Sequence, residues 1–142
     1  MYRGFATAAV AAILAFAHPA AAEVIPLTAQ LTAHAEVPPN PSQAHGTAGL
    51  SLDTQSRNLA WTIHYAGMSA QLSAAHFHGP ATTAGNAGIL VPIDASKGQS
   101  PLTGFATLTQ SRVDEVLAGR WYINLHTRTY PGGEIRGQVL RK

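Results

Sequence analysis

The chain has 142 residues, of which nine are Lys or Arg, seven are Asp or Glu and none is Cys. The basic residues are scattered along the sequence, and this excludes a nucleic-acid-binding protein that relies on a clustered basic surface. Because it has no cysteine, an exported chain of this composition depends on packing or on a metal, not on disulfides, for its stability.

The first 22 residues have the pattern of a secretory signal peptide. Arg3 supplies a positive start, residues 5–17 form an apolar run of small side chains, and residues 20–22 offer an A-x-A cleavage site. The apolar run is shorter than the roughly 20 residues that span a bilayer. We therefore expect cleavage after residue 22, export to the periplasm or the cell exterior, and a single domain over 23–142 with no stable membrane span.

Beyond the signal peptide the sequence reads as short β segments separated by turn residues. The segments expected to form strands are 26–33, 47–53, 59–67, 72–78, 89–93, 102–108, 120–127 and 135–140. Thr109 can cap a short helix over 109–119, and the Pro-Gly-Gly turn at 131–133 predicts a hairpin. This order predicts an all-β fold, an antiparallel β-sandwich or flattened Greek-key barrel of about seven or eight strands with one short helix.

The sequence contains few patterns that indicate catalysis. It has no G-x-S-x-G motif, no cysteine nucleophile and no glycine motif that cradles a phosphate. The larger aromatic residues Trp61, Tyr65, Phe105 and Trp121 are expected in the core and not at a ligand site. The composition therefore favours a binding module over an enzyme that works without a cofactor.

Two histidines stand two residues apart in the stretch AAHFHG. In an extended strand His76 and His78 point to the same side, with Phe77 opposite. Their Cα atoms would lie about 6.5 Å apart, and from that separation two imidazoles can reach one ion. Tight binding needs a third ligand. His126, on the polar face of its predicted strand, is the first candidate, and His64 is the next.

A set of imidazole ligands without thiolates suits copper or zinc. In the alternative interpretation, the histidines bond to backbone carbonyls at the strand ends and bind no metal. His34 and His45 flank a proline-rich loop at 37–46, so they can approach the site only if that loop folds back.

Three stretches of the sequence, AHFHGPA, AGRWYINLHT and PGGEIRGQ, resemble the chordin-type (CHRD) domain in content and in order. The resemblance runs from about residue 27 to residue 140. It implies an all-β sandwich and an extracellular setting, since the family includes exported bacterial single-domain proteins and the repeated domains of chordin. It does not imply a reaction.

The family pattern falls on His76, His78, Gly79, Pro80, Asn124, His126, Gly132, Gly133, Glu134, Arg136 and Gly137. Asn124, Glu134 and Arg136 are candidates for side chains that orient a histidine ring, and Glu134 and Arg136 also suit a purely structural role after the turn. His45 and His64 lie outside the pattern.

Three hypotheses remain open at this point. The first is an exported binding module that holds a copper or zinc ion through the histidines, with a protein partner outside the cell as a further possibility. The second is a copper-dependent oxidoreductase, since HFHG also resembles the copper strand of copper-zinc superoxide dismutases, whose zinc loop, disulfide cysteines and guiding arginine have no counterpart here. The third is a metal-free extracellular structural or protein-interaction domain in which the histidines pin the loop 79–88.

Overall fold

The computed structural model of the chain describes residue 1 and residues 22–142. Residues 2–21 of the predicted signal peptide lie outside the described residues. The elements follow in the order β1 (Val24–Thr32), η1 (Ala33–Ala35), β2 (His45–Asp53), β3 (Asn58–Ala66), β4 (Leu72–His78), β5 (Ile89–Pro92), β6 (Leu102–Thr107), α1 (Gln110–Leu117), β7 (Tyr122–Thr127), β8 (Ile135–Gln138) and β9 (Leu140–Arg141).

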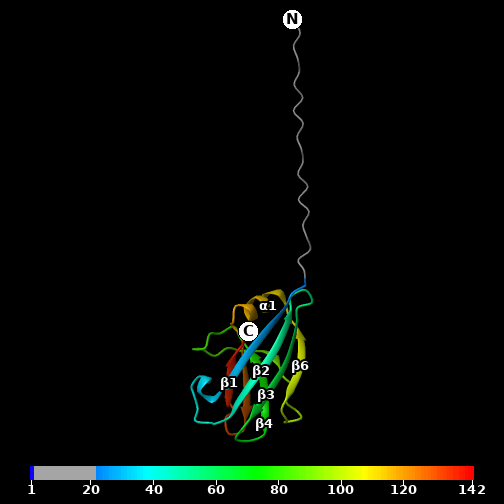
Figure 1. Cartoon of the computed structure of the whole chain (residues 1–142). Coiled ribbons are helices and arrows are strands. Elements are labelled where there is room, and N and C mark those ends of the chain that lie inside the picture. Colours follow the sequence, from blue (N-terminus) through cyan, green and yellow to red (C-terminus); the bar gives the residue numbers. More distant parts are fainter. Residues whose placement is uncertain (2–21) are drawn as a thin grey trace.

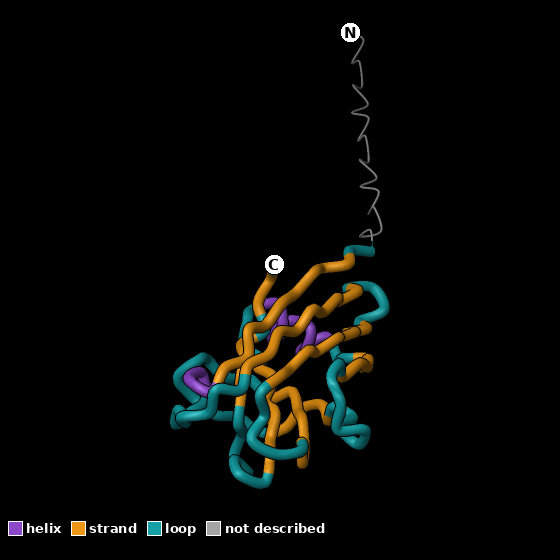
Figure 2. Tube along the Cα trace, turned by 60° about the horizontal axis from the view of Figure 1, so that its bottom comes forward, coloured by secondary structure: helices purple, strands orange, loops and turns teal. Residues whose placement is uncertain are grey.

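The strands form one antiparallel sheet that curls into a nearly closed barrel (Figures 1 and 2). Its strand order is β5-β4-β7-β8-β1-β2-β3-β6, and β9 pairs with β1 outside this path. The predicted all-β class and the short helix are confirmed, and the arrangement is the barrel-like one of the two that the sequence left open. Because β4, β7 and β8 are neighbours, the three sequence stretches that contain the site residues meet on one side of the barrel.

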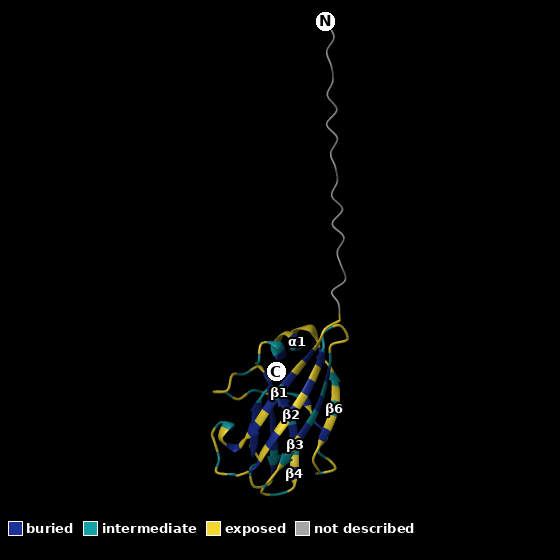
Figure 3. Ribbon diagram, in the orientation of Figure 1, coloured by how far each residue is buried: buried dark blue, intermediate teal, exposed yellow. Residues whose placement is uncertain are grey.

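Alternating side chains explain why these segments form strands with one face in the core. Along β2 the residues are exposed and buried in strict turn, and β1 follows nearly the same pattern. Figure 3 shows the resulting stripes of buried and exposed positions along β1, β2 and β3. The inward residues, among them Leu31, Leu52, Ile63 and Phe77, are fully buried in one apolar core.

The helix α1 lies at one end of the barrel (Figure 1). The hydroxyl of Thr109 accepts a hydrogen bond from the Arg112 backbone N–H, as expected of an N-cap. Val113 and Val116 are buried in the core, and Gly119, with a φ of +68°, follows the helix end. Neither α1 nor η1, the helices of the described part, is long and apolar enough to cross a membrane.

The prediction that Phe105 belongs to the core is wrong, because its side chain is 73% exposed. Phe105 lies on the outward face of β6, whose inward positions include Gly104. A Cβ atom at Gly104 would lie 2.6 Å from the Trp61 ring. The Trp61 indole therefore occupies the interior space beside β6, and the large side chain of this strand faces outward.

The outward face of β4, β7 and β8 is covered, unlike that of β2, by two loops at residues 36–44 and 79–88. The side chain of Asn86 donates to the carbonyl of Val37, which joins the two loops to each other. Arg136 on β8 donates to the carbonyls of Thr82 and Gly85 and is 1% exposed. A second, polar interior therefore forms between this face and the loops, and the histidine cluster lies at its edge.

Candidate metal centre

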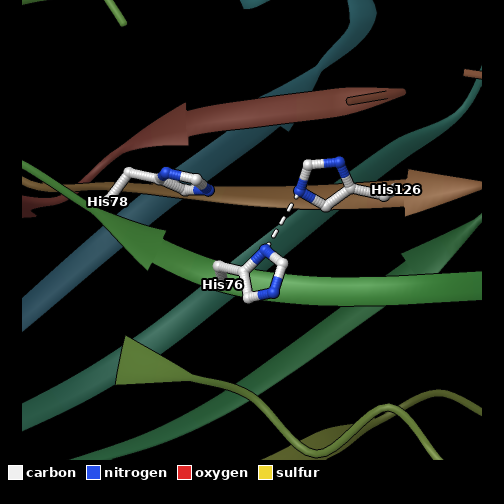
Figure 4. Close-up of side chains that lie close together, drawn as sticks. All are labelled: His76, His78 and His126. Atoms are coloured by element: carbon white, nitrogen blue, oxygen red, sulfur yellow. Dashed lines mark hydrogen bonds between the residues drawn. The ribbon is translucent and has the colours of Figure 1, made fainter. Parts of the chain in front are cut away.

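The register between β4 and β7 brings the three predicted histidines together. His126 pairs with Ala74, and His76 pairs with Asn124, so these side chains share the outward face of adjacent strands. Phe77 points the opposite way and is fully buried in the core. Figure 4 shows the rings of His76, His78 and His126 converging from the two strands. Each of the three residues is partly buried.

The ring nitrogens are close enough to share one ion. One candidate ligand atom from each of His76, His78 and His126 lies within 4.8 Å of the other two. His76 Nδ1 and His126 Nε2 are 3.2 Å apart and share a hydrogen bond (Figure 4). Zinc and similar ions are bound at about 2.0–2.1 Å from each imidazole nitrogen. Small rotations of the rings would therefore be enough to bring three nitrogens to one ion.

Two backbone carbonyls fix which nitrogen of two rings carries the hydrogen. His78 Nδ1 lies 3.0 Å from the Ala87 carbonyl, and His126 Nδ1 lies 3.0 Å from the Pro131 carbonyl. Since a carbonyl can only accept, each Nδ1 donates, and in the neutral ring each Nε2 keeps a free lone pair. Carbonyl or carboxylate partners of this kind orient the histidine ligands of metal sites.

The Nε2 atom of His78 is buried and has no hydrogen-bond partner in the described part of the chain. A buried nitrogen with an unused lone pair is costly, and such atoms are usually satisfied by a donor, a water or an ion. His126 Nε2 is already an acceptor for His76 Nδ1, so His76 would offer a lone pair to an ion after moving its hydrogen to the other ring nitrogen.

The surroundings keep all three imidazoles neutral. Burial lowers the pKa of His76, and the neighbouring His126 and His78 rings lower it further. Burial also lowers the pKa values of His78 and His126, even though their carbonyl partners act in the opposite direction. Neutral rings are the form that can bind a metal, and the lowered pKa values favour this form at neutral pH.

A stack of side chains supports His78 from β7 and β8. The His78 and Tyr122 rings are parallel within 5°, with centroids 4.9 Å apart. The Arg136 guanidinium carbon lies 3.6 Å from the centroid of the same Tyr122 ring. The Tyr122 hydroxyl also accepts a hydrogen bond from the backbone N–H of Ala87, the residue that orients His78. Arg136 therefore influences the site through Tyr122, without touching a histidine.

The other two residues predicted to orient a histidine have different partners. The amide of Asn124 donates to the Glu36 carboxyl. Glu134 is fully buried and accepts hydrogen bonds from Ser42, Ser69 and Thr127. Burial would raise the pKa of Glu134, but these hydrogen bonds outweigh it and the pKa is lowered. Glu134 thus holds loops against β7, and it does not pair with Arg136.

The other histidines of residues 22–142, which are His34, His45 and His64, do not join the cluster. His64 is exposed on β3 and lies with His45 beside a separate surface pocket. His34 is exposed in η1. In the strand order, β3 is separated from β7 by β8, β1 and β2, so the structure does not bring His64 to the three histidines.

The sequence reasoning missed the contributions of Ala87, Pro131 and Glu36. The carbonyls of Ala87 and Pro131 belong to irregular loops, and no side-chain pattern marks them. Tyr122 was within reach of the sequence, because the period of two along the strand predicts that it shares the face of Asn124 and His126 and could line a pocket there.

The family model of the CHRD domain matches residues 27–139, nearly the whole described part of the chain. No curated protein and no solved structure matches the chain. The matched range contains most of β1, all of β2 to β8 and all three histidines of the cluster.

Proposed function

Because the chain belongs to the CHRD family, whose domains are typically extracellular interaction modules, we propose that it is an exported binding module that holds one copper or zinc ion. The proposed ligands are His76, His78 and His126. The observation that carries this proposal is the buried Nε2 of His78, which has no hydrogen-bond partner among residues 22–142 and lies beside two further imidazoles.

The donor set favours these two metals. Three neutral imidazoles suit zinc and copper, whereas calcium and magnesium prefer oxygen ligands. The Ala87 and Pro131 carbonyls would hold two rings in the coordinating tautomer, and the Tyr122–Arg136 stack would limit the motion of His78. Three protein ligands leave a fourth coordination position for water or another small ligand.

The proposal also includes export and cleavage after residue 22. The supporting observations are the signal-like sequence of residues 1–22 and the usual extracellular setting of the family. In a periplasm or outside a cell, a chain without cysteine cannot use disulfides, and a bound ion would stabilise the loops that supply the Ala87 and Pro131 carbonyls.

The test is metal content after loading with Cu(II) or Zn(II) and dialysis. We expect about one ion per chain in the wild type and a large loss in His78→Ala. The matched control is His64→Ala, because His64 is a histidine on the same barrel but outside the cluster. Circular dichroism establishes that each variant is folded. If folded His78→Ala keeps the wild-type content, the proposed ligand set is wrong.

A second readout separates metal binding from a purely structural role of the histidines. An ion that binds the folded chain raises its melting temperature, and above the dissociation constant this rise grows with the logarithm of the ion concentration. We expect this rise in the wild type and in His64→Ala, with chelator reversing it. No response to metal or chelator in the wild type would favour the metal-free interaction domain.

A further inference from the structure

Glu36 is a buried carboxyl group that the proposed metal site does not use. It follows η1, its backbone N–H donates to the Ala33 carbonyl, and the residue is 5% exposed. Within residues 22–142 its side chain accepts one hydrogen bond, from Asn124 Nδ2 to Oε1, at 2.5 Å. The second oxygen, Oε2, is left without a protein donor.

Glu36 lies between two cavities. One, of about 360 Å³, is lined by Glu36 together with Pro38, Asn40, Asn86, Tyr130 and Pro131, and we call it the Glu36 pocket. The other, of about 330 Å³, shares Glu36 and reaches Arg136. A carboxyl oxygen without a partner is therefore placed where a ligand can enter.

The two amide side chains that line the Glu36 pocket, Asn40 and Asn86, already have hydrogen-bond partners. The amide of Asn40 donates to the carbonyls of Gly133 and Glu134. Asn86 donates to the Val37 carbonyl and accepts from Arg136. Among the described residues that line the cavity, Glu36 supplies the carboxyl group, and its Oε2 has no protein donor.

The pocket also lacks a cation of its own. Among the described residues that line it, none is Lys or Arg. Arg136 lies on the side of the second cavity, where Thr82, Gly85 and Asn86 accept its hydrogen bonds. Burial raises the pKa of Glu36 to about 7, although Arg136 and the Asn124 amide partly oppose this. The raised pKa means that burial outweighs the attraction of Arg136, so this positive charge compensates the carboxylate only in part.

We propose that the Glu36 pocket binds a primary ammonium group, either of a lysine side chain on a protein partner or of a small free amine. The ammonium group would donate to Oε2 of Glu36. The Tyr130 ring and the prolines of the pocket wall would contact the methylene chain, as apolar surfaces commonly do for lysine. This proposal does not depend on metal binding by the histidines.

The test is a titration followed by amide chemical shifts in two-dimensional NMR spectra. The probe is Nα-acetyl-lysine methylamide, and the uncharged control ligand is Nα-acetyl-norleucine methylamide, which lacks the ammonium group. We expect saturable shifts around residues 36, 124 and 133 with the lysine probe and none with the norleucine compound. A parallel titration with butylamine distinguishes two kinds of site. A site for small amines binds butylamine as well as the lysine probe, whereas a site for a lysine of a protein partner also contacts the peptide groups and binds the lysine probe more tightly.

Two variants test the role of Glu36. Glu36→Gln keeps the shape and the acceptor for Asn124 but removes the charge, so we expect affinity for the lysine probe to fall by about tenfold or more. His64→Ala changes an exposed residue on β3 that does not line the pocket, and it is expected to bind the probe as the wild type does. The proposal is overturned if the lysine probe causes no shifts, if norleucine binds equally well, or if folded Glu36→Gln keeps the wild-type affinity.

Discussion

Replacing Glu36 by Gln should stabilise the protein at alkaline pH and leave its stability almost unchanged at acid pH. The pKa of Glu36 is raised from its ordinary value of 4.5 to about 7, mainly by burial. A raised pKa means that the folded state holds the proton more tightly than the unfolded state. The contribution of Glu36 to the stability of the wild type is therefore greatest below pH 4.5, falls as pH rises toward 7, and is then constant.

The size of the effect follows from the same values. A tenfold change in proton affinity corresponds to about 1.4 kcal/mol, so a rise from 4.5 to about 7 corresponds to roughly 3 kcal/mol. Because Glu36 borders two open cavities, water screens part of this cost. We expect Glu36→Gln to raise the free energy of unfolding by about 2 kcal/mol at pH 8.5 and by less than about 0.5 kcal/mol at pH 4.

Urea denaturation across this pH range measures the difference directly. Glu23→Gln is the matched control, because Glu23 is an exposed acid whose replacement should change stability little at either pH. A difference between Glu36→Gln and wild type that does not vary with pH would refute the argument that burial dominates. A variant less stable than wild type at pH 8.5 would mean that the attraction of Arg136 outweighs burial.

Two further predictions concern stability and are checked by the same denaturation experiments. Gly133→Ala should destabilise the protein by more than about 2 kcal/mol, because Gly133 has a φ of +131° and an added Cβ would overlap the Asn124 amide. The control Gly132→Ala should cost little, because nothing lies within 4 Å of the added Cβ. Equal losses of stability in the two variants would contradict this geometry. Phe105→Ser should change the free energy of unfolding by less than about 0.5 kcal/mol, because the Phe105 ring is exposed. Phe77→Ala should cost about 3–5 kcal/mol, because the Phe77 ring is fully buried. A large loss of stability in Phe105→Ser would mean that this ring is buried in solution.

The strands and the shared face of His76 and His78 could be predicted because both depend on a local period of two. The same parity places His126 on the polar face of its strand, and the hairpin turn places β8 beside β7. The pairing of β4 with β7 could not be predicted, since it joins segments about 50 residues apart. Only this register distinguishes His126 from His64 as the third member of the cluster.

The burial of Glu36 and Arg136 could not be predicted from local sequence patterns. Glu36 and Arg136 lie in loops and on an outward strand face, where exposure is the usual expectation. They are buried because the loops 36–44 and 79–88 fold over the sheet and supply their hydrogen-bond partners. The exposure of Phe105 also depends on a residue distant in the sequence. The Trp61 ring on β3 fills the interior space beside Gly104, so the large side chain of β6 lies on the outer face.

The most direct test of the proposed metal centre is X-ray absorption spectroscopy of the zinc-loaded protein. The account predicts a first shell that contains three imidazole nitrogens at about 2.0–2.1 Å, and the loss of one of them in a folded His126→Ala variant. A first shell made only of oxygen atoms, or one unchanged by this substitution, would contradict a metal centre formed by His76, His78 and His126.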